Sequence, residues 1–263
     1  MVSGGKVQMK IVKDGVADIA EVPIPYTPGR VDGIEVFELP NLANTNLDGS
    51  LTTLKMIDEG LIKGLEDFVV LGVLQAGPYL IHTKDKVESL RDLRGLKLRV
   101  SGKTQAQIVS RLGALPVSNI PATGIAENVS RGLIDGALID TGNLYNFGVG
   151  NLLHHHVTNL RLGSFPVLWL MSKARYNTLP EDARSAIDAS GGLWFTTELG
   201  TNMNKQTDSV LARLKASGDH HFVEFSEKDL KRASNILDRV VKDYTKQSPS
   251  HEQWFEAAQS NIQ

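Results

Sequence analysis

The stretch LRDLRGLKLRV, residues 90–100, decides the fold of this chain. In its second half, residues 96–100, apolar side chains alternate with the cations Lys97 and Arg99. Alternation with a period of two residues is typical of a strand that buries one face. The turn residues SGKT follow at 101–104, and an amphipathic helical pattern comes after them. A strand that runs through a short loop into a helix predicts an α/β fold.

Arg99 lies near the carboxyl end of this expected strand and faces the strand-to-helix loop. Open α/β sheets bind their ligands at this position. A guanidinium also suits a carboxylate, because its planar fork can donate two parallel hydrogen bonds. A solvated strand residue or one half of a structural ion pair would show the same pattern, and the pattern alone favours that structural interpretation.

Strands and helices alternate along the rest of the chain. FVVLGVL at 68–74 is almost wholly apolar, as expected of a strand that is covered on both faces. Residues 165–171, which are apolar and aromatic, predict another strand. Thr178 and Glu181, with Pro180 between them, predict a capping box at the start of a long helix. We expect this helix to continue to about residue 217 with a bend at the Gly191-Gly192 pair.

Composition narrows the functional class. Of the 263 residues, 41% are hydrophobic and 22% charged, which is ordinary for a globular protein. The net charge of −2 gives no reason to expect nucleic acid as a partner. The chain has no cysteine, which excludes thiol catalysis and cysteine metal sites. No apolar run approaches the roughly 20 residues that span a bilayer, so we expect no direct membrane insertion.

Catalytic signatures are missing from the sequence. There is no GxSxG elbow, no P-loop and no HExxH motif, and no cofactor is expected. Histidines cluster at 154–156, and His220 and His221 follow Asp219. Adjacent histidines cannot all point one way, and residues 140–163 have a loop composition. We therefore expect a solvated or partly packed loop here and no metal site.

Several aromatic residues leave two interpretations open. Phe165 and Trp169 lie four residues apart, a spacing that puts both on one face of a strand. Core packing and a ligand platform fit this pair equally well. The same alternatives hold for Tyr26 in the proline-rich loop at 23–30 and for Tyr79 beside Gly77-Pro78.

Segments spread along the chain together resemble the solute-binding proteins of TRAP (tripartite ATP-independent periplasmic) transporters, of the dicarboxylate-binding type. They are GVADIA at 15–20, FELP at 37–40, LRDLRGLKLRV at 90–100, LGALPV at 112–117, RGLIDGA at 131–137 and YNTLPEDAR at 176–184. The similarity extends from about Lys13 to Val241.

The resemblance implies an α/β, two-lobed periplasmic-binding-protein-like fold with an interlobe cleft and a long crossing helix. Lobe I would comprise residues 1–76 and 165–204, and lobe II residues 77–164 and 205–263. The family's strand arginine, here Arg99, would pair with the carboxylate of an organic acid in the cleft. The ligand-bound form would be recognised by the TRAP membrane subunits in the periplasm, without chemical change of the ligand.

The expected ligand contacts follow from the same resemblance. They are Arg99, Tyr26, Tyr79, Phe165, Trp169, Asp140 and Thr141. Some family members carry a second arginine where this chain has Tyr79. A neutral phenol at that position suggests a monocarboxylate with an apolar or aromatic body.

Family members normally begin with a strand, a helix and a second strand before the segment that matches GVADIA, and here only a short stretch precedes it. We therefore expect lobe I to lack its opening strands and the signal peptide, leaving an unpaired strand edge beside residues 68–74. The main alternative is a metal-dependent α/β enzyme that uses Asp135, Asp140 or the histidines. A third is a cytoplasmic binding or interaction module with the same lobes.

Overall fold

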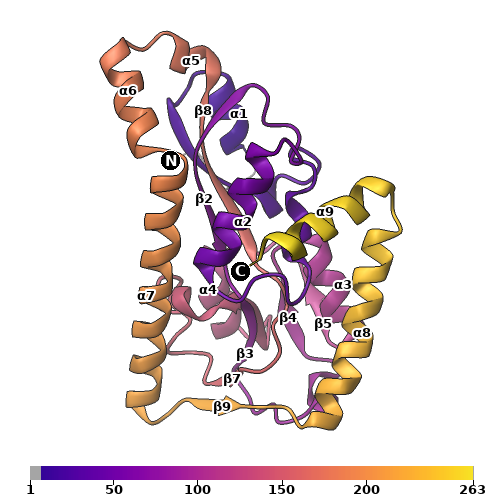
Figure 1. Ribbon diagram of the computed structural model, residues 1–263. Coiled ribbons are helices and arrows are strands. Elements are labelled where there is room, and N and C mark those ends of the chain that lie inside the picture. The colour runs from indigo at the N-terminus through magenta and orange to yellow at the C-terminus, as the bar shows by residue number, and fades with distance from the viewer. Residues whose placement is uncertain (1–6, 263) are drawn as a thin grey trace.

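The computed structural model describes residues 7–262 (Figure 1). Its α-helices in this range are α1 (Gln8–Lys13), α2 (Asn46–Asp58), α3 (Lys103–Arg111), α4 (Ile125–Ser130), α5 (Lys173–Asn177), α6 (Glu181–Ser190), α7 (Leu193–Ser217), α8 (Glu227–Thr245) and α9 (Pro249–Asn261). The strands are β1 (Ile19–Pro23), β2 (Phe68–Ala76), β3 (Tyr79–Thr83), β4 (Lys97–Arg99), β5 (Leu115–Val117), β6 (Gly136–Asp140), β7 (His155–Val157), β8 (Phe165–Ser172) and β9 (His221–Val223). Short 3₁₀ turns are η1 (Ile24–Tyr26), η2 (Ile34–Glu38), η3 (Leu90–Leu93), η4 (Ala122–Gly124) and η5 (Thr141–Asn143).

Two separate sheets organise these elements into two lobes. The lobe I sheet has three antiparallel strands in the order β1-β8-β2. The lobe II sheet has six strands in the order β5-β4-β6-β3-β7-β9, with parallel and antiparallel neighbours. Figure 1 shows β2 and β8 in the upper half of the molecule and the lobe II strands below them. The predicted two-lobed α/β fold is confirmed.

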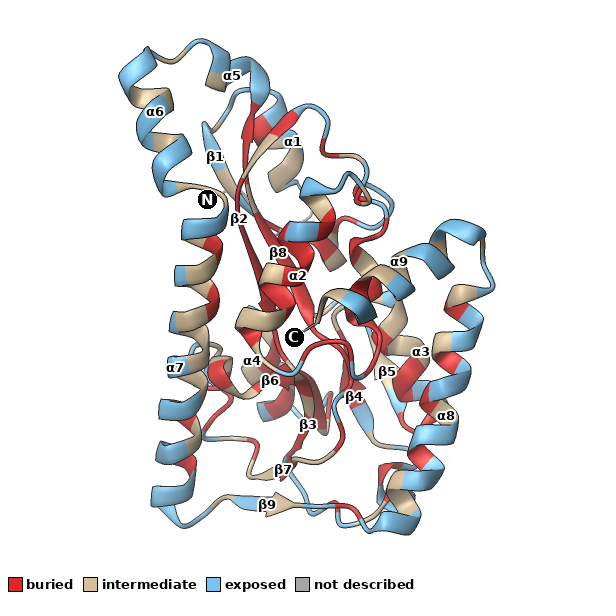
Figure 2. Ribbon diagram, viewed as in Figure 1, coloured by how far each residue is buried: buried red, intermediate tan, exposed pale blue. Residues whose placement is uncertain are grey.

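The chain passes between the lobes where β2 leads into β3 and where β8 begins. Backbone hydrogen bonds join the two passages: Tyr79 N donates to Gly163 O at 2.7 Å, and Leu162 N donates to Tyr79 O at 2.9 Å. Figure 2 shows that buried residues follow β2, β8 and β3 through the centre of the molecule, with helices outside them. In the described part of the chain, no helix has the length and apolar character needed to cross a membrane.

Helix α7 contacts both lobes along one side of the molecule (Figure 1). In lobe I it packs against α2 and β2, and Asn204 accepts a hydrogen bond from Asn46 N at 3.0 Å. In lobe II it packs against η5, and the Gln206 side chain donates to Gly142 O at 2.8 Å. The expected long crossing helix is therefore present.

The start of the long helix differs from the prediction. Thr178 forms no capping box, because its hydroxyl donates to Arg175 O at 2.7 Å and it ends α5. Pro180 itself is the N-cap residue of α6. The expected bend is a complete break between α6 and α7, since Gly192 has a φ of 57° and a ψ of −121° that no helix can contain.

The expected strand edge beside β2 is present, but it is not exposed. Strand β2 does lie at the edge of its sheet, but helix α2 and the start of α7 supply partners for its outward backbone groups. Val73 N donates to Thr196 Oγ1 at 3.1 Å, and Gln75 N donates to Ser50 Oγ at 2.9 Å. Leu71 O accepts from Gly192 N. Side chains of α2 and α7 and the backbone of Gly192 thus replace the neighbouring strand that would otherwise be needed.

Candidate functional site

Arg99 is the last residue of β4, between β5 and β6 in the lobe II sheet. Its side chain is fully buried, with an exposed fraction of 0%. The guanidinium donates from Nε to Ile120 O at 2.9 Å, from Nη1 to Leu138 O at 3.4 Å and from Nη2 to Tyr26 OH at 2.8 Å. Two partners are backbone carbonyls and the third is a phenol, so the buried cation has only neutral neighbours in direct contact.

The charge of Arg99 has no anionic partner within residues 7–262, since none of the ion pairs there includes it. A guanidinium stays protonated at every physiological pH. Burying a charge is unfavourable unless an opposite charge compensates it. The surroundings of Arg99 therefore favour the entry of an anion.

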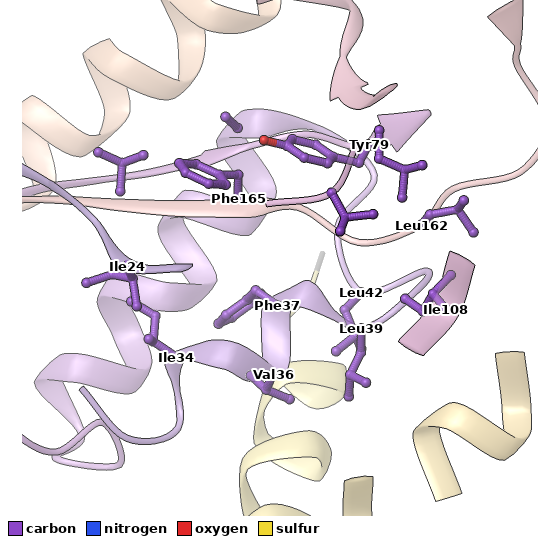
Figure 3. Packing of buried hydrophobic residues seen from close by; sticks show 14 of the residues in the cluster. Ile24, Ile34, Val36, Phe37, Leu39, Leu42, Tyr79, Ile108, Leu162 and Phe165 are labelled. Carbon is purple, nitrogen blue, oxygen red and sulfur yellow. The ribbon is translucent and has the colours of Figure 1, made fainter. Parts of the chain in front are cut away.

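Aromatic rings from both lobes lie around this arginine. Phe165, at the start of β8, contacts Tyr26 with ring centroids 5.3 Å apart and stacks on Tyr79 at 6.1 Å, with an angle of 3° between those two rings. Figure 3 shows the Phe165 and Tyr79 rings among the buried apolar residues. The Tyr26 hydroxyl also accepts from Ala122 N at 3.1 Å, so this residue of η1 in lobe I is bonded to lobe II twice. We call Arg99, Tyr26, Tyr79 and Phe165 the arginine site.

Tyr79 carries no charge at this site. Burial raises the pKa of its phenol well above the usual value, and the positive charge of Arg99 opposes that rise. Asp140 lies opposite Tyr79 in the pairing of β3 with β6 and is also buried. Burial raises the pKa of Asp140 to about 6, while the Asn143 amide, which donates to both carboxylate oxygens at 3.1 and 3.0 Å, lowers it. Asn143 therefore holds this carboxylate, and Arg99 does not.

Two further predicted contacts, Trp169 and Thr141, have other neighbours in the structure. Trp169, in the middle of β8, packs against Phe195 of α7 with ring centroids 5.6 Å apart. Four residues of strand separate it from Phe165 by about 13 Å, so the two rings form no common platform. Thr141, which is half-buried, lines a cavity of about 200 Å³ together with Pro78 and Thr207.

Sequence reasoning missed a buried acid on η2. Glu38 is only 5% exposed, and its Oε2 atom has no hydrogen-bond partner within the described range. Burial, with a smaller contribution from the charge of Glu35, raises the pKa of Glu38 to about 8. Glu38 lines a cavity of about 290 Å³ together with Lys103 and Tyr244. In the sequence its only signal was its place within the FELP motif.

The residues of the enzyme alternative do not converge. Asp135 precedes β6 and accepts a hydrogen bond from Lys97 N at 2.8 Å, whereas Asp140 ends the same strand. The expected histidine loop is wrong: residues 155–157 form β7, and His156 is 1% exposed. Adjacency to β3 and β9, which the sequence could not show, turns this segment into a buried strand.

Comparison with known proteins identifies the family. Residues 2–247 match the bacterial extracellular solute-binding proteins of family 7. The chain belongs to this family. A solute-binding protein of Albidiferax ferrireducens is 23% identical over 244 residues, which are 90% of this chain and 71% of that protein. This family membership favours solute binding over the enzyme alternative.

Solved structures of TRAP solute-binding proteins share the fold. One from an unidentified marine microbe, specific for aromatic acid ligands and bound to meta-hydroxyphenylacetate, has a TM-score of 0.91 and 26% identity, covering 99% of this chain and 84% of that one. Another, from Rhodoferax ferrireducens with copurified benzoate, has a TM-score of 0.88 and 28% identity, covering 99% and 83%. The protein is thus a TRAP solute-binding protein, from a family whose members are periplasmic, bind small organic acids and work with TRAP membrane subunits.

Proposed function

We propose that this protein binds an aromatic monocarboxylic acid at the arginine site, between the two lobes, and carries it through the periplasm to TRAP membrane subunits. The ligand leaves chemically unchanged. The observation that carries the proposal is the buried guanidinium of Arg99, whose direct partners are all neutral. A carboxylate would supply the missing charge and accept two parallel hydrogen bonds from the planar fork.

The rings of the arginine site suit an aromatic ligand body. Tyr26, Tyr79 and Phe165 already form edge-to-face and stacked pairs with one another, the geometries that aromatic rings prefer. Tyr79 is neutral, so it gives no second cation for a dicarboxylate. The marine and Rhodoferax relatives, which bind aromatic acids and benzoate, support this class of ligand.

The lobes would close around the ligand. We assign residues 7–76 and 165–204 to lobe I and residues 77–164 and 205–262 to lobe II; residues 1–6 and 263 of the predicted lobes lie outside the described residues. Arg99 then comes from lobe II, while Tyr26 and Phe165 come from lobe I, so a ligand that contacts all three joins the lobes. It would shift the population toward the closed form that the membrane subunits recognise. Trp169 and Thr141 lie outside these direct contacts.

Calorimetric titration tests the proposal. Benzoate and 3-hydroxybenzoate should bind the wild-type protein, and succinate should bind more weakly or not at all. Arg99→Ala should weaken benzoate binding about 30-fold or more, because truncating one partner of a buried charge pair costs about 2–5 kcal/mol. Lys97→Ala is the matched control, since Lys97 is an exposed cation two residues earlier on the same strand.

The control should bind like the wild type. Equal affinity in a folded Arg99→Ala protein would overturn the assignment of Arg99, and preferential binding of succinate would overturn the ligand class. Mass spectrometry of the ligand recovered after incubation should find it unaltered. A converted product would instead indicate an enzyme.

A further inference from the structure

Six of the seven histidines gather at one edge of the lobe II sheet, on β3, β7 and the start of β9. They are His82, His154, His155, His156, His220 and His221. Strand alternation sorts them onto two faces. His220 stacks on His154 and His156, with centroids 4.8 and 5.1 Å apart, and His155 stacks on His221 at 4.7 Å on the other face.

A chain of hydrogen bonds fixes the proton positions on the first face. His82 Nε2 must donate to Ile139 O, 3.1 Å away, because a carbonyl oxygen only accepts. A neutral imidazole carries one ring proton, so His82 Nδ1 accepts from His156 Nδ1 at 2.7 Å. His156 Nε2 then accepts from His220 Nδ1 at 2.9 Å. The inner two rings are buried, with exposed fractions of 0% for His82 and 1% for His156, where a charged imidazole would be unfavourable.

This chain leaves a free lone pair on His220 Nε2. That atom lies 3.7 Å from Asp219 Oδ1, so two hydrogen-bond acceptors face each other. His154 Nδ1 lies 3.6 Å from the other carboxylate oxygen, Asp219 Oδ2, and donates to Asp219 O at 3.2 Å, so a metal ion bound through Nδ1 would replace this hydrogen bond. Ligand atoms of His154, Asp219 and His220 all lie within 4.8 Å of one another, and no other three His, Asp or Glu residues in the described range meet this criterion. A cation placed among them would satisfy both acceptors.

We propose that His154, Asp219 and His220 bind a divalent transition metal ion, for which Zn²⁺ is the best match. Zn²⁺ takes imidazole nitrogens and carboxylate oxygens at about 2.0–2.2 Å, and its three-ligand sites hold a water molecule at the fourth position. His156 is a positioning residue: it accepts the Nδ1 proton of His220 and so directs the Nε2 lone pair toward the ion. Partners of this kind orient most histidine ligands of metals.

The ion would connect two distant parts of lobe II. His154 directly precedes β7, whereas Asp219 and His220 lie between the end of α7 and β9. Metal binding would hold the end of the crossing helix against the sheet and so stabilise the folded protein. This role is independent of the proposed ligand at Arg99.

The test uses full-length protein without a histidine tag, freed of metal with a chelator. Calorimetry with Zn²⁺ should give one ion per chain, and Co²⁺ should give the visible absorption bands of a low-coordinate site. Asp219→Asn and His220→Ala should each weaken Zn²⁺ binding more than about 100-fold, since even loss of an outer partner costs about 10- to 100-fold. His156→Ala removes only such an outer partner and should weaken Zn²⁺ binding about 10- to 100-fold.

His155→Ala and His221→Ala are the matched controls, because this stacked pair lies on the opposite face of the same two strands. Both should bind Zn²⁺ like the wild type. No binding to the wild type, undiminished binding to Asp219→Asn, or an equal loss in the controls would each overturn the proposal. If His220→Ala does not fold by circular dichroism, Asp219→Asn decides, because the Asp219 side chain is 61% exposed and its replacement disturbs no core.

Discussion

Arg99 and Glu38 are both buried near the contact between the lobes, yet burial affects them in opposite ways. Arg99 is 0% exposed and Glu38 is 5% exposed. Glu38 avoids its charge by keeping a proton, because burial raises its pKa to about 8. Arg99 cannot lose its proton, so its charge stays in the protein interior. One group therefore adapts to burial by protonation, while the other keeps its charge, and for this reason we propose that an anionic ligand binds beside Arg99.

Glu38 lies where lobe I contacts lobe II, so its protonation would change if the lobes separated. Glu38 ends η2 in lobe I, and its Oε2 atom faces Gly102, the N-cap residue of α3 in lobe II. A Cβ atom on Gly102 would lie 2.5 Å from that oxygen, so a larger residue at this position would require the Glu38 side chain to shift. Separation of the lobes would return the carboxyl group to water, and we expect its pKa to fall toward the usual range.

We expect the largest effect from Glu38→Gln, which should make the protein more stable than the wild type at high pH. The folded-state pKa of Glu38, about 8, lies above the usual 4.5, so the unfolded chain loses this proton first. The wild-type free energy of unfolding should therefore fall relative to the variant between pH 4.5 and 8, then stay level. The full difference should be about 3–5 kcal/mol.

Urea unfolding at pH 5 and pH 9 measures this difference. Glutamine has the shape of the protonated acid, so the two proteins should be similar at pH 5. Glu256→Gln, a change at an exposed position, should leave the pH dependence of the wild type intact. If Glu38→Gln retains that pH dependence as well, Glu38 is charged in the folded protein, and it then does not differ from Arg99 in keeping its charge when buried.

Arg99→Lys tests the fixed charge of the arginine. Lysine keeps a positive charge but loses the planar fork, so benzoate binding should weaken by about 1.5–3 kcal/mol, the value of one hydrogen bond to a charged group. Burial also lowers the pKa of a lysine. Affinity for benzoate should therefore fall as the pH rises from 6 to 9 in the variant and stay constant in the wild type. Parallel pH profiles in calorimetry would contradict this explanation.

Tyr26→Phe tests the hydrogen bonds that connect Arg99 to lobe I. The lost hydroxyl accepts from Arg99 Nη2 and from Ala122 N, so two largely buried donors lose their partner. We expect the free energy of unfolding to decrease by about 1–2 kcal/mol. Tyr176→Phe is the control, because its hydroxyl is bonded to Asp188 on the exposed surface and should matter little. An equal decrease in the free energy of unfolding of the two variants would show that the contact with Arg99 stabilises the protein no more than an exposed hydrogen bond does.

Local patterns predicted the elements around the site. The period-two alternation at 96–100 placed Arg99 at the end of a strand, and the apolar segments at 68–74 and 165–171 became β2 and β8. The start of α7 was not predictable in this way. The Thr178 hydroxyl is used by the preceding helix, and Gly192 ends one helix and begins another.

Features that depend on distant residues were not predictable from the sequence. The partner of His156 is His220, 64 residues later, so a loop was expected where β7 forms. The partner of Trp169 is Phe195 of α7, and sequence spacing to Phe165 could not reveal it. Glu38 was missed because nothing in FELP indicates that its carboxyl group is buried.

The smallest expected effect is a difference in benzoate affinity between variants of Phe165 and Trp169, the two aromatic residues of β8. Phe165→Leu removes a ring that stacks on Tyr79 and contacts Tyr26, and we expect benzoate affinity to fall by about 0.5–1.5 kcal/mol, the value of an aromatic pair beyond its buried area. Trp169→Leu makes a similar change on the same strand, but its ring packs on Phe195. Calorimetry with benzoate should find this variant close to the wild type. Because both variants lose an aromatic ring from one strand, a general loss of stability would affect both. A larger loss of affinity in Trp169→Leu than in Phe165→Leu would move the ligand away from Arg99 and toward α7.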